Sequence, residues 1–136
     1  MFLTKKGDKY EGEFHEGKFS GRGTYRYLKG DRYEGYWREG VKSGKGTYFW
    51  ANGTTYEGDF DKDLPHGQGI FIMKNGHKFY EGEVAYGLKE GEGVMRSPNG
   101  DRYKGEYHLN AKHGKGIYVW ANGNIYSGSF IRDMPS

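Results

Sequence analysis

YEGEF (Tyr10–Phe14) is the first of six versions of one five-residue stretch, and the return of this stretch along the chain decides the fold. The six tyrosines that begin these stretches are 23, 23, 24, 23 and 23 residues apart. A period of about 20 to 50 residues is typical of an array of stacked structural repeats. The other five stretches are YEGYW (Tyr33–Trp37), YEGDF (Tyr56–Phe60), YEGEV (Tyr80–Val84), YKGEY (Tyr103–Tyr107) and YSGSF (Tyr126–Phe130).

Each of the first five units also contains a Gly-x-Gly element, which begins eleven residues after the tyrosine. Pairs that favour β-structure, such as Thr24-Tyr25, follow this element, and turn-forming pairs such as Asn52-Gly53 close the unit. Each unit is therefore predicted to be two short strands. We expect loops such as HEGKFSGR (15–22) at one edge of the sheet and tight Asn-Gly turns at the other.

Side chains alternate with a period of two, so that Tyr10, Gly12 and Phe14 share one side of a strand and Glu11 and Glu13 share the other. This alternation predicts an antiparallel meander with one aromatic and one polar face, and it excludes helix. A glycine recurs at the centre of all six stretches, although glycine weakens a strand. We predict that an aromatic ring from the neighbouring strand lies flat over each of these glycines and takes the place of a second layer.

The composition supports a folded chain with a thin core. Of 136 residues, 34% are hydrophobic, 18% are aromatic and 25 are glycine, so rings must supply most of the apolar surface. There is no cysteine and no long apolar run, and we expect a soluble cytoplasmic protein without disulfides. The 21 basic and 18 acidic residues are interspersed, which does not suggest nucleic acid as a partner.

No pattern in the sequence indicates catalysis, a metal or a cofactor. The glycine-rich stretches lack the Lys-Ser/Thr of a phosphate loop, and Glu11 and Glu13 share an open strand face. The five histidines lack metal-ligand spacing, and no serine or threonine has a base and an orienting partner. We therefore predict a protein that is not an enzyme.

The aromatic face is the best candidate site. Tyrosine and tryptophan rings that stay partly exposed on a one-layer sheet are good anchors for a protein partner, either an extended peptide or a helix. The residues predicted to form this aromatic groove are Tyr25, Tyr27, Trp37, Tyr48, Trp50, Phe71, Tyr107, Tyr118 and Trp120.

Two further surfaces suggest other partners. Basic residues in the Gly-x-Gly loops could contact acidic lipid head groups, although Glu39, Asp63 and Glu90 share their edge and favour a solvated charged edge. The terminal half-units Phe2–Thr4 and Tyr126–Phe130 lack a neighbouring strand, which suggests self-association or a chain cut from a longer array. The basic residues singled out for lipid contact are Lys42, Lys45, Lys112 and Lys115.

The repeat resembles that of the MORN (membrane occupation and recognition nexus) family over nearly the whole chain. The resemblance implies one domain over residues 1–136, an all-β, elongated, twisted single-layer antiparallel sheet with five full units, half-units at both ends and about twelve strands. It also implies an interaction scaffold in a cytoskeletal, ciliary or membrane-cortex assembly. The alternatives are a phosphoinositide-binding module and an accessory domain of a larger enzyme. The extra residue in the fourth unit predicts a β-bulge near residues 77–80.

Overall fold

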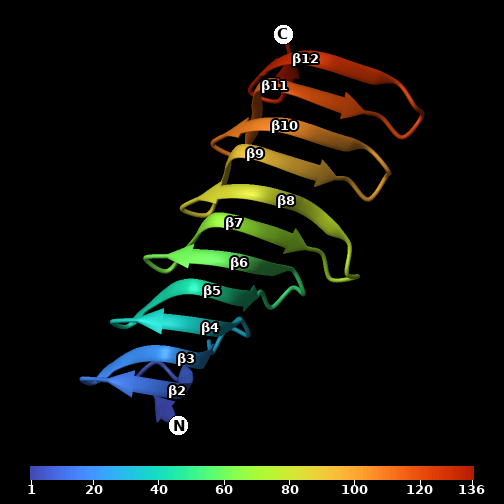
Figure 1. Ribbon diagram of the computed structural model, residues 1–136. Helices are drawn as coiled ribbons and strands as arrows, with labels where there is room; N and C mark the ends of the chain where they lie inside the picture. The colour runs from blue at the N-terminus through green and yellow to red at the C-terminus, as the bar shows by residue number, and fades with distance from the viewer.

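The computed structural model describes residues 1–136 and contains no helix. Thirteen strands form a single antiparallel sheet, and their order in the sheet is their order in the chain. The strands follow one another from the N-terminal to the C-terminal end of a twisted ribbon, so the termini lie at opposite ends (Figure 1). The predicted all-β, single-layer fold is confirmed.

Eleven long strands of seven to nine residues make up the body of the sheet, and a two-residue strand lies at each end. The strands are β1 (Phe2–Leu3), β2 (Lys9–His15), β3 (Lys18–Arg26), β4 (Arg32–Arg38), β5 (Val41–Phe49), β6 (Thr55–Asp61), β7 (Leu64–Ile72), β8 (Lys78–Ala85), β9 (Leu88–Arg96), β10 (Arg102–His108), β11 (Ala111–Val119), β12 (Ile125–Ile131) and β13 (Met134–Pro135).

A continuous row of glycines crosses the sheet from β2 to β12, because every strand places one glycine opposite the glycine of the next strand. We call this row the glycine ladder. A tyrosine ring covers every second pair, beginning with Gly12 and Gly23, and a Cβ added to Gly23 would overlap the ring of Tyr10. The ladder runs through Gly12, Gly23, Gly35, Gly46, Gly58, Gly69, Gly82, Gly93, Gly105, Gly116 and Gly128.

The prediction of rings over glycines holds, with one correction. Gly23 lies on the strand next to that of Tyr10, as predicted. Gly12, however, lies on the same strand as Tyr10, two residues after it. The ring therefore lies over Gly23 on the partner strand, and its hydroxyl reaches Gly12 and donates to the carbonyl of Glu13 at 2.8 Å. All six repeat tyrosines make the same bond three residues on, at 2.6–2.9 Å.

A β-bulge after the ladder glycine turns that carbonyl toward the tyrosine. The register of β2 against β3 shifts between Gly12 and Phe14, and the same shift recurs in β4, β6, β8 and β10. The side chain at the bulge then returns to the partner strand, where Glu13 accepts a hydrogen bond from the backbone N–H of Arg22. These recurring bulges were not predicted from the sequence.

The turns correct the expected edge geometry. The tightest connection is the one expected to be a loop: β2 ends at His15, β3 begins at Lys18, and Glu16 and Gly17 both have positive φ, 49° and 78°. Positive φ at both central residues is the signature of a two-residue type I′ hairpin turn. The Asn-Gly edge instead has longer connections, such as the one in which Trp50 N–H donates to Thr54 and Gly53 N–H donates to Trp50.

The bulge predicted in the fourth unit is confirmed. Phe71 pairs with Tyr80 and Ile72 pairs with Lys78, so Phe79 is the extra residue in β8. Because Phe79 has no partner of its own on β7, the added residue leaves the register of the glycine ladder unchanged. The predicted edge at the C-terminus also differs, since Met134 and Pro135 fold back as β13 and pair with Ile131 and Phe130.

The core occupies one face of the sheet. Five repeat tyrosines are fully buried, namely Tyr10, Tyr33, Tyr56, Tyr80 and Tyr103, although no second layer covers them. Each is enclosed by its own ladder glycines and by neighbouring rings such as Phe14, which meets the ring of Tyr10 edge-on at 5.2 Å. Only 18 of the 136 residues are buried, and 11 of these form the hydrophobic core, so ring-on-glycine packing is central to that core.

We predict that Gly46→Ala destabilises the fold strongly, because the new methyl group would overlap the hydroxyl and ring of Tyr33. Overpacking of this kind costs about 1–3 kcal/mol, and the crowding here is at the upper end. The matched control is Gly128→Ala, where the nearest atoms of Tyr126 lie 2.8 and 3.0 Å away and the ring is only half-buried. Urea denaturation followed by tryptophan fluorescence compares the two, and an equal loss in both would contradict the ladder's role.

Candidate interaction surface

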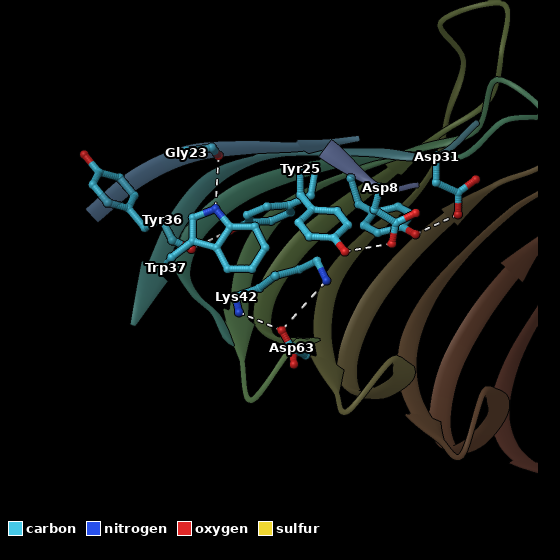
Figure 2. Close-up of polar contacts among 10 residues, drawn as sticks. Asp8, Gly23, Tyr25, Asp31, Tyr36, Trp37, Lys42 and Asp63 are labelled. Atoms are coloured by element: carbon cyan, nitrogen blue, oxygen red, sulfur yellow. Dashed lines mark hydrogen bonds and ion pairs between the residues drawn. The ribbon is translucent and has the colours of Figure 1, made fainter. Parts of the chain in front are cut away.

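The aromatic face is built from rows of side chains that cross the strands in register. Next to the buried tyrosines lies a row at the end of each five-residue stretch, in which Trp37 and Phe60 meet the ring of Tyr33 edge-on at 5.1 and 4.9 Å. The indole N–H of Trp37 donates to the carbonyl of Gly23 at 3.1 Å, as Figure 2 shows. The rings are therefore fixed by the ladder as well as by one another.

Aspartates at the start of three units hold the next row of tyrosines. The carboxylate of Asp8 accepts a hydrogen bond from the hydroxyl of Tyr25 at 2.7 Å (Figure 2). It also accepts one from the backbone N–H of Leu28 at 2.8 Å. Asp31 binds Tyr48 and Ala51 in the same way. Asp101 repeats the arrangement with Tyr118 and Ala121.

These bonds keep the aspartates charged. The backbone N–H of Leu28 and the Tyr25 hydroxyl lower the pKa of Asp8 below its ordinary value. Burial alone would raise the pKa of Asp31, but the Tyr48 hydroxyl and the Ala51 N–H outweigh it, and the net direction is down. Burial and the neighbouring carboxylate raise the pKa of Tyr25 to about 12, so its hydroxyl remains a donor.

The tyrosine and the aspartate occur together in this chain and are lost together. Where the aspartate position holds Thr54, its tyrosine position holds Phe71, which has no hydroxyl. Where it holds His77, the tyrosine position holds Met95. The aspartates were missed as structural residues in the sequence, although the recurring Gly-Asp-Lys/Arg-Tyr pattern at residues 7–10, 30–33 and 100–103 is a signal for them.

A basic side chain lies inside the aromatic face. Lys42 is only 7% exposed, and its ammonium lies 5.3–5.8 Å from the ring centres of Tyr27, Tyr33, Trp37 and Tyr48. Asp63 accepts a hydrogen bond from the backbone N–H of Lys42 at 2.7 Å and lies 3.8 Å from the ammonium (Figure 2). Burial lowers the pKa of Lys42, and the Asp63 carboxylate opposes that change.

The nine predicted groove residues all lie on this face, but they differ in accessibility. Tyr25, Trp37 and Tyr107 belong to the buried core. Trp120 is 39% exposed. The remaining five, which are half-buried and pack against the core, are Tyr27, Tyr48, Trp50, Phe71 and Tyr118. The accessible part of the predicted groove is therefore these five rings and Trp120, which we call the open aromatic row.

The four lysines chosen for lipid contact do not come together. Lys42 and Lys112 point to the aromatic face, where Lys112 pairs with Asp133 at 3.3 Å. Lys45 points to the polar face and pairs with Asp59. All of these lysines lie in β5 or β11 and not in loops, because the tight turns leave the Gly-x-Gly segments inside strands.

The polar face carries a hollow of about 750 Å³ over the glycine ladder. Glu34, Glu57 and Glu81 line it from alternate strands, together with Lys45 and Arg96. Arg96 lies 3.7 Å from Glu81, so charges of both signs meet there. No three histidine, aspartate or glutamate side chains in the structure are arranged to hold a metal ion. No helix in it is long and apolar enough to cross a membrane.

The fold and the site define an open repeat array with one ring-lined face. The family model for the MORN repeat matches residues 10–32, 33–55, 56–78, 80–102 and 103–125, and the chain belongs to the MORN-repeat family. The MORN repeat is generally a non-enzymatic module. A comparison with curated proteins finds no match.

A search of solved structures finds similar folds. One is the TCP domain of SAS-4 (dCPAP) of Drosophila melanogaster, solved in complex with a proline-rich motif of Ana2 (dSTIL). The similarity has a TM-score of 0.54 at 17% sequence identity and covers 90% of this chain and 66% of that chain. At this identity the likeness shows the fold, a single-layer sheet, and no more.

We predict that stability falls with acid because the aspartates have lowered pKa values in the folded state. The unfolded chain takes up protons near the ordinary aspartate value of 3.8, while folded Asp8, Asp31 and Asp101 still resist protonation. Their contribution is complete above that value and is lost as pH falls through the folded values. Urea midpoints at about pH 6 and about pH 3 should show this, with a shallower loss in Asp31→Asn.

We also predict that the missing pair can be grafted. Thr54→Asp with Phe71→Tyr should raise the free energy of unfolding by about 1 kcal/mol, because it adds a hydrogen bond from a tyrosine hydroxyl to a carboxylate where the wild type has none. Phe71→Tyr alone should give a smaller gain, since its half-buried hydroxyl would face the neutral threonine hydroxyl and not a carboxylate. Thermal unfolding of both variants checks this, and an equal gain from the single variant would contradict it.

Proposed function

We propose that this chain is a protein-interaction domain that binds an extended peptide along its open aromatic row. The observation that carries the proposal is a sheet with one layer, whose ring-lined face has nothing packed over it. Half-exposed tyrosine and tryptophan rings contribute contact area at small entropic cost, and they retain a polar group for orientation. The rigid sheet holds these rings in place before a partner arrives, which favours binding.

The spacing of the rings supports an extended partner over a globular one. Tyr48 and Trp50 lie with ring centres 4.9 Å apart, and Trp50 and Phe71 stack at 6.3 Å. Tyr118 and Trp120 repeat the first pair at 4.7 Å, three units along the sheet. A peptide that crosses the strands can contact the first group of rings with one segment and the second group with a later segment.

A proline-rich sequence suits this surface chemically. Polyproline II segments are extended and lose little entropy on binding, and aromatic grooves commonly recognise them. The structural neighbour SAS-4 was solved with a proline-rich motif, which adds a precedent on the same fold. We therefore propose an extended peptide that contains proline as the ligand class.

The alternative of a lipid-binding surface has less support. The four lysines are split between two faces, and three of them pair with Asp59, Asp63 or Asp133. Electrostatic recruitment to a membrane needs about four to eight uncompensated basic residues. Sedimentation with vesicles containing phosphatidylinositol 4,5-bisphosphate tests this alternative. Self-association through the sheet edges and a place in a cytoskeletal, ciliary or membrane-cortex assembly stay predictions.

We predict that Trp50→Ala with Trp120→Ala weakens peptide capture at least tenfold and leaves the fold intact, because both rings lie at the accessible side of the face. The probe is a random dodecapeptide phage library panned on the wild-type chain. The control is Tyr36→Ala, since Tyr36 is 43% exposed but lies on the opposite, polar face. Unfolding of the double variant would show that the tryptophans are core, and equal losses in variant and control would refute the proposed surface.

A further inference from the structure

One position on the aromatic face holds a lysine in three of the five units. The five residues at this position, nine after the repeat tyrosine, are Phe19, Lys42, Pro65, Lys89 and Lys112. In each case the tight turn of the next unit lies beside this position. The second residue of that turn donates its backbone N–H to the carbonyl of the strand residue, as Asp63 does to Lys42 at 3.2 Å. The turn residue therefore decides whether the lysine has a counter-charge.

The charges of the two positions match in four of the five cases. Phe19 and Pro65, which carry no charge, lie beside Gly40 and Gly87. Lys42 lies beside Asp63 and Lys112 beside Asp133, and both lysines form ion pairs there, at 3.8 and 3.3 Å.

Lys89 is the exception, because Asn110 stands where the other two lysines have aspartate. The backbone geometry is the same in the two cases that are compared directly. Asn110 accepts from the N–H of Lys89 at 2.8 Å, and Asp133 accepts from the N–H of Lys112 at 2.8 Å. The φ angles of these two turn residues are 72° and 70°. The Lys89 site thus has the same backbone geometry as the Lys112 site and lacks only the carboxylate.

The ammonium of Lys89 is also held in place. It lies over the rings of Tyr80 and Tyr107, at 5.6 and 5.7 Å from their centres, and the residue is half-buried. Burial lowers its pKa, while Asp133 and Lys112 act on it from a longer range in opposite directions. No carboxylate lies within ion-pair distance of it, so this half-buried cation has no ion-pair partner within the chain.

We propose that Lys89 binds the carboxylate of an acidic side chain in a peptide lying on the aromatic face. The proposal rests on the proposed function, and charge complementarity selects the occupant: a fixed, half-buried ammonium between rings matches one carboxylate flanked by apolar residues. A phosphoinositide head group fits less well, since it carries several charges and Asp63 and Asp133 lie on the same face. The peptide therefore needs an aspartate or glutamate in register with the fourth unit.

The test uses peptides selected from the dodecapeptide phage library on the full wild-type chain and then synthesised with a fluorophore. Fluorescence anisotropy measures their affinity for wild type, Lys89→Met, Asn110→Asp and the matched control Lys112→Met. Asn110→Asp supplies the missing carboxylate and keeps the bond to the backbone N–H, so it neutralises Lys89 without removing it. Circular dichroism and urea midpoints establish that each variant is folded.

We expect the selected peptides to share an acidic residue. Lys89→Met and Asn110→Asp should each weaken binding about tenfold, whereas Lys112→Met, whose ammonium already pairs with Asp133, should change it less than about twofold. Replacing the acidic residue of the peptide by alanine should cost about tenfold on wild type and almost nothing on Lys89→Met.

The other possible results distinguish a failure of the Lys89 proposal from a failure of the proposed function. Peptides that need Trp50 and Trp120 but show no acidic preference would leave the proposed function standing and refute the role of Lys89. A library that yields no peptide would refute both. Binding to vesicles of phosphatidylinositol 4,5-bisphosphate that depends on Lys89, with no peptide effect, would assign the lysine to lipid instead.

Discussion

The packing of a tyrosine ring against bare glycine backbone is the interaction on which this structure depends. In each hairpin the ring lies over the partner strand's glycine, its hydroxyl reaches the facing glycine of its own strand, and that hydroxyl bonds to the carbonyl at the bulge. A side chain on the glycine beneath a buried ring, such as Gly23 or Gly46, would occupy the space of that ring, so the glycine, the tyrosine and the bulge form one structural unit. Because that unit is complete within two strands, the sheet needs no second layer and can be extended strand by strand.

This way of burying apolar surface explains why the face remains available. The rings closest to the ladder are sealed, and those farther along the strands, such as Trp50 and Trp120, keep part of their surface in contact with water. The same strands hold their charges in fixed places, since Asp31 positions Tyr48 and Asp63 neutralises Lys42. The inner row therefore supports the fold, and the outer row is the surface that we propose for recognition.

Much of the architecture could be predicted because it depends on patterns within a short stretch of sequence. The period of the tyrosines, the alternation along each stretch and the extra residue at Phe79 are all visible in the chain itself. The bulge at Glu13 could not be predicted in this way, because a glutamate beside a glycine looks like any residue on a solvated strand face. The tight turn at Glu16-Gly17 was assigned to the wrong edge, because glycine permits positive φ in either connection and only the pairing distinguishes them.

The sequence by itself determined the one-layer repeat fold, the division into an aromatic and a polar face, and the glycines that must stay bare, because these depend on spacing within a unit. Only the tertiary structure decided which rings remain accessible and which lysines are neutralised. The counter-charge of Lys42 lies in the turn of the next unit, and that of Lys89 is missing from the equivalent turn. Such pairs depend on how neighbouring hairpins are registered and twisted, and residues about twenty positions apart meet only after the sheet has formed.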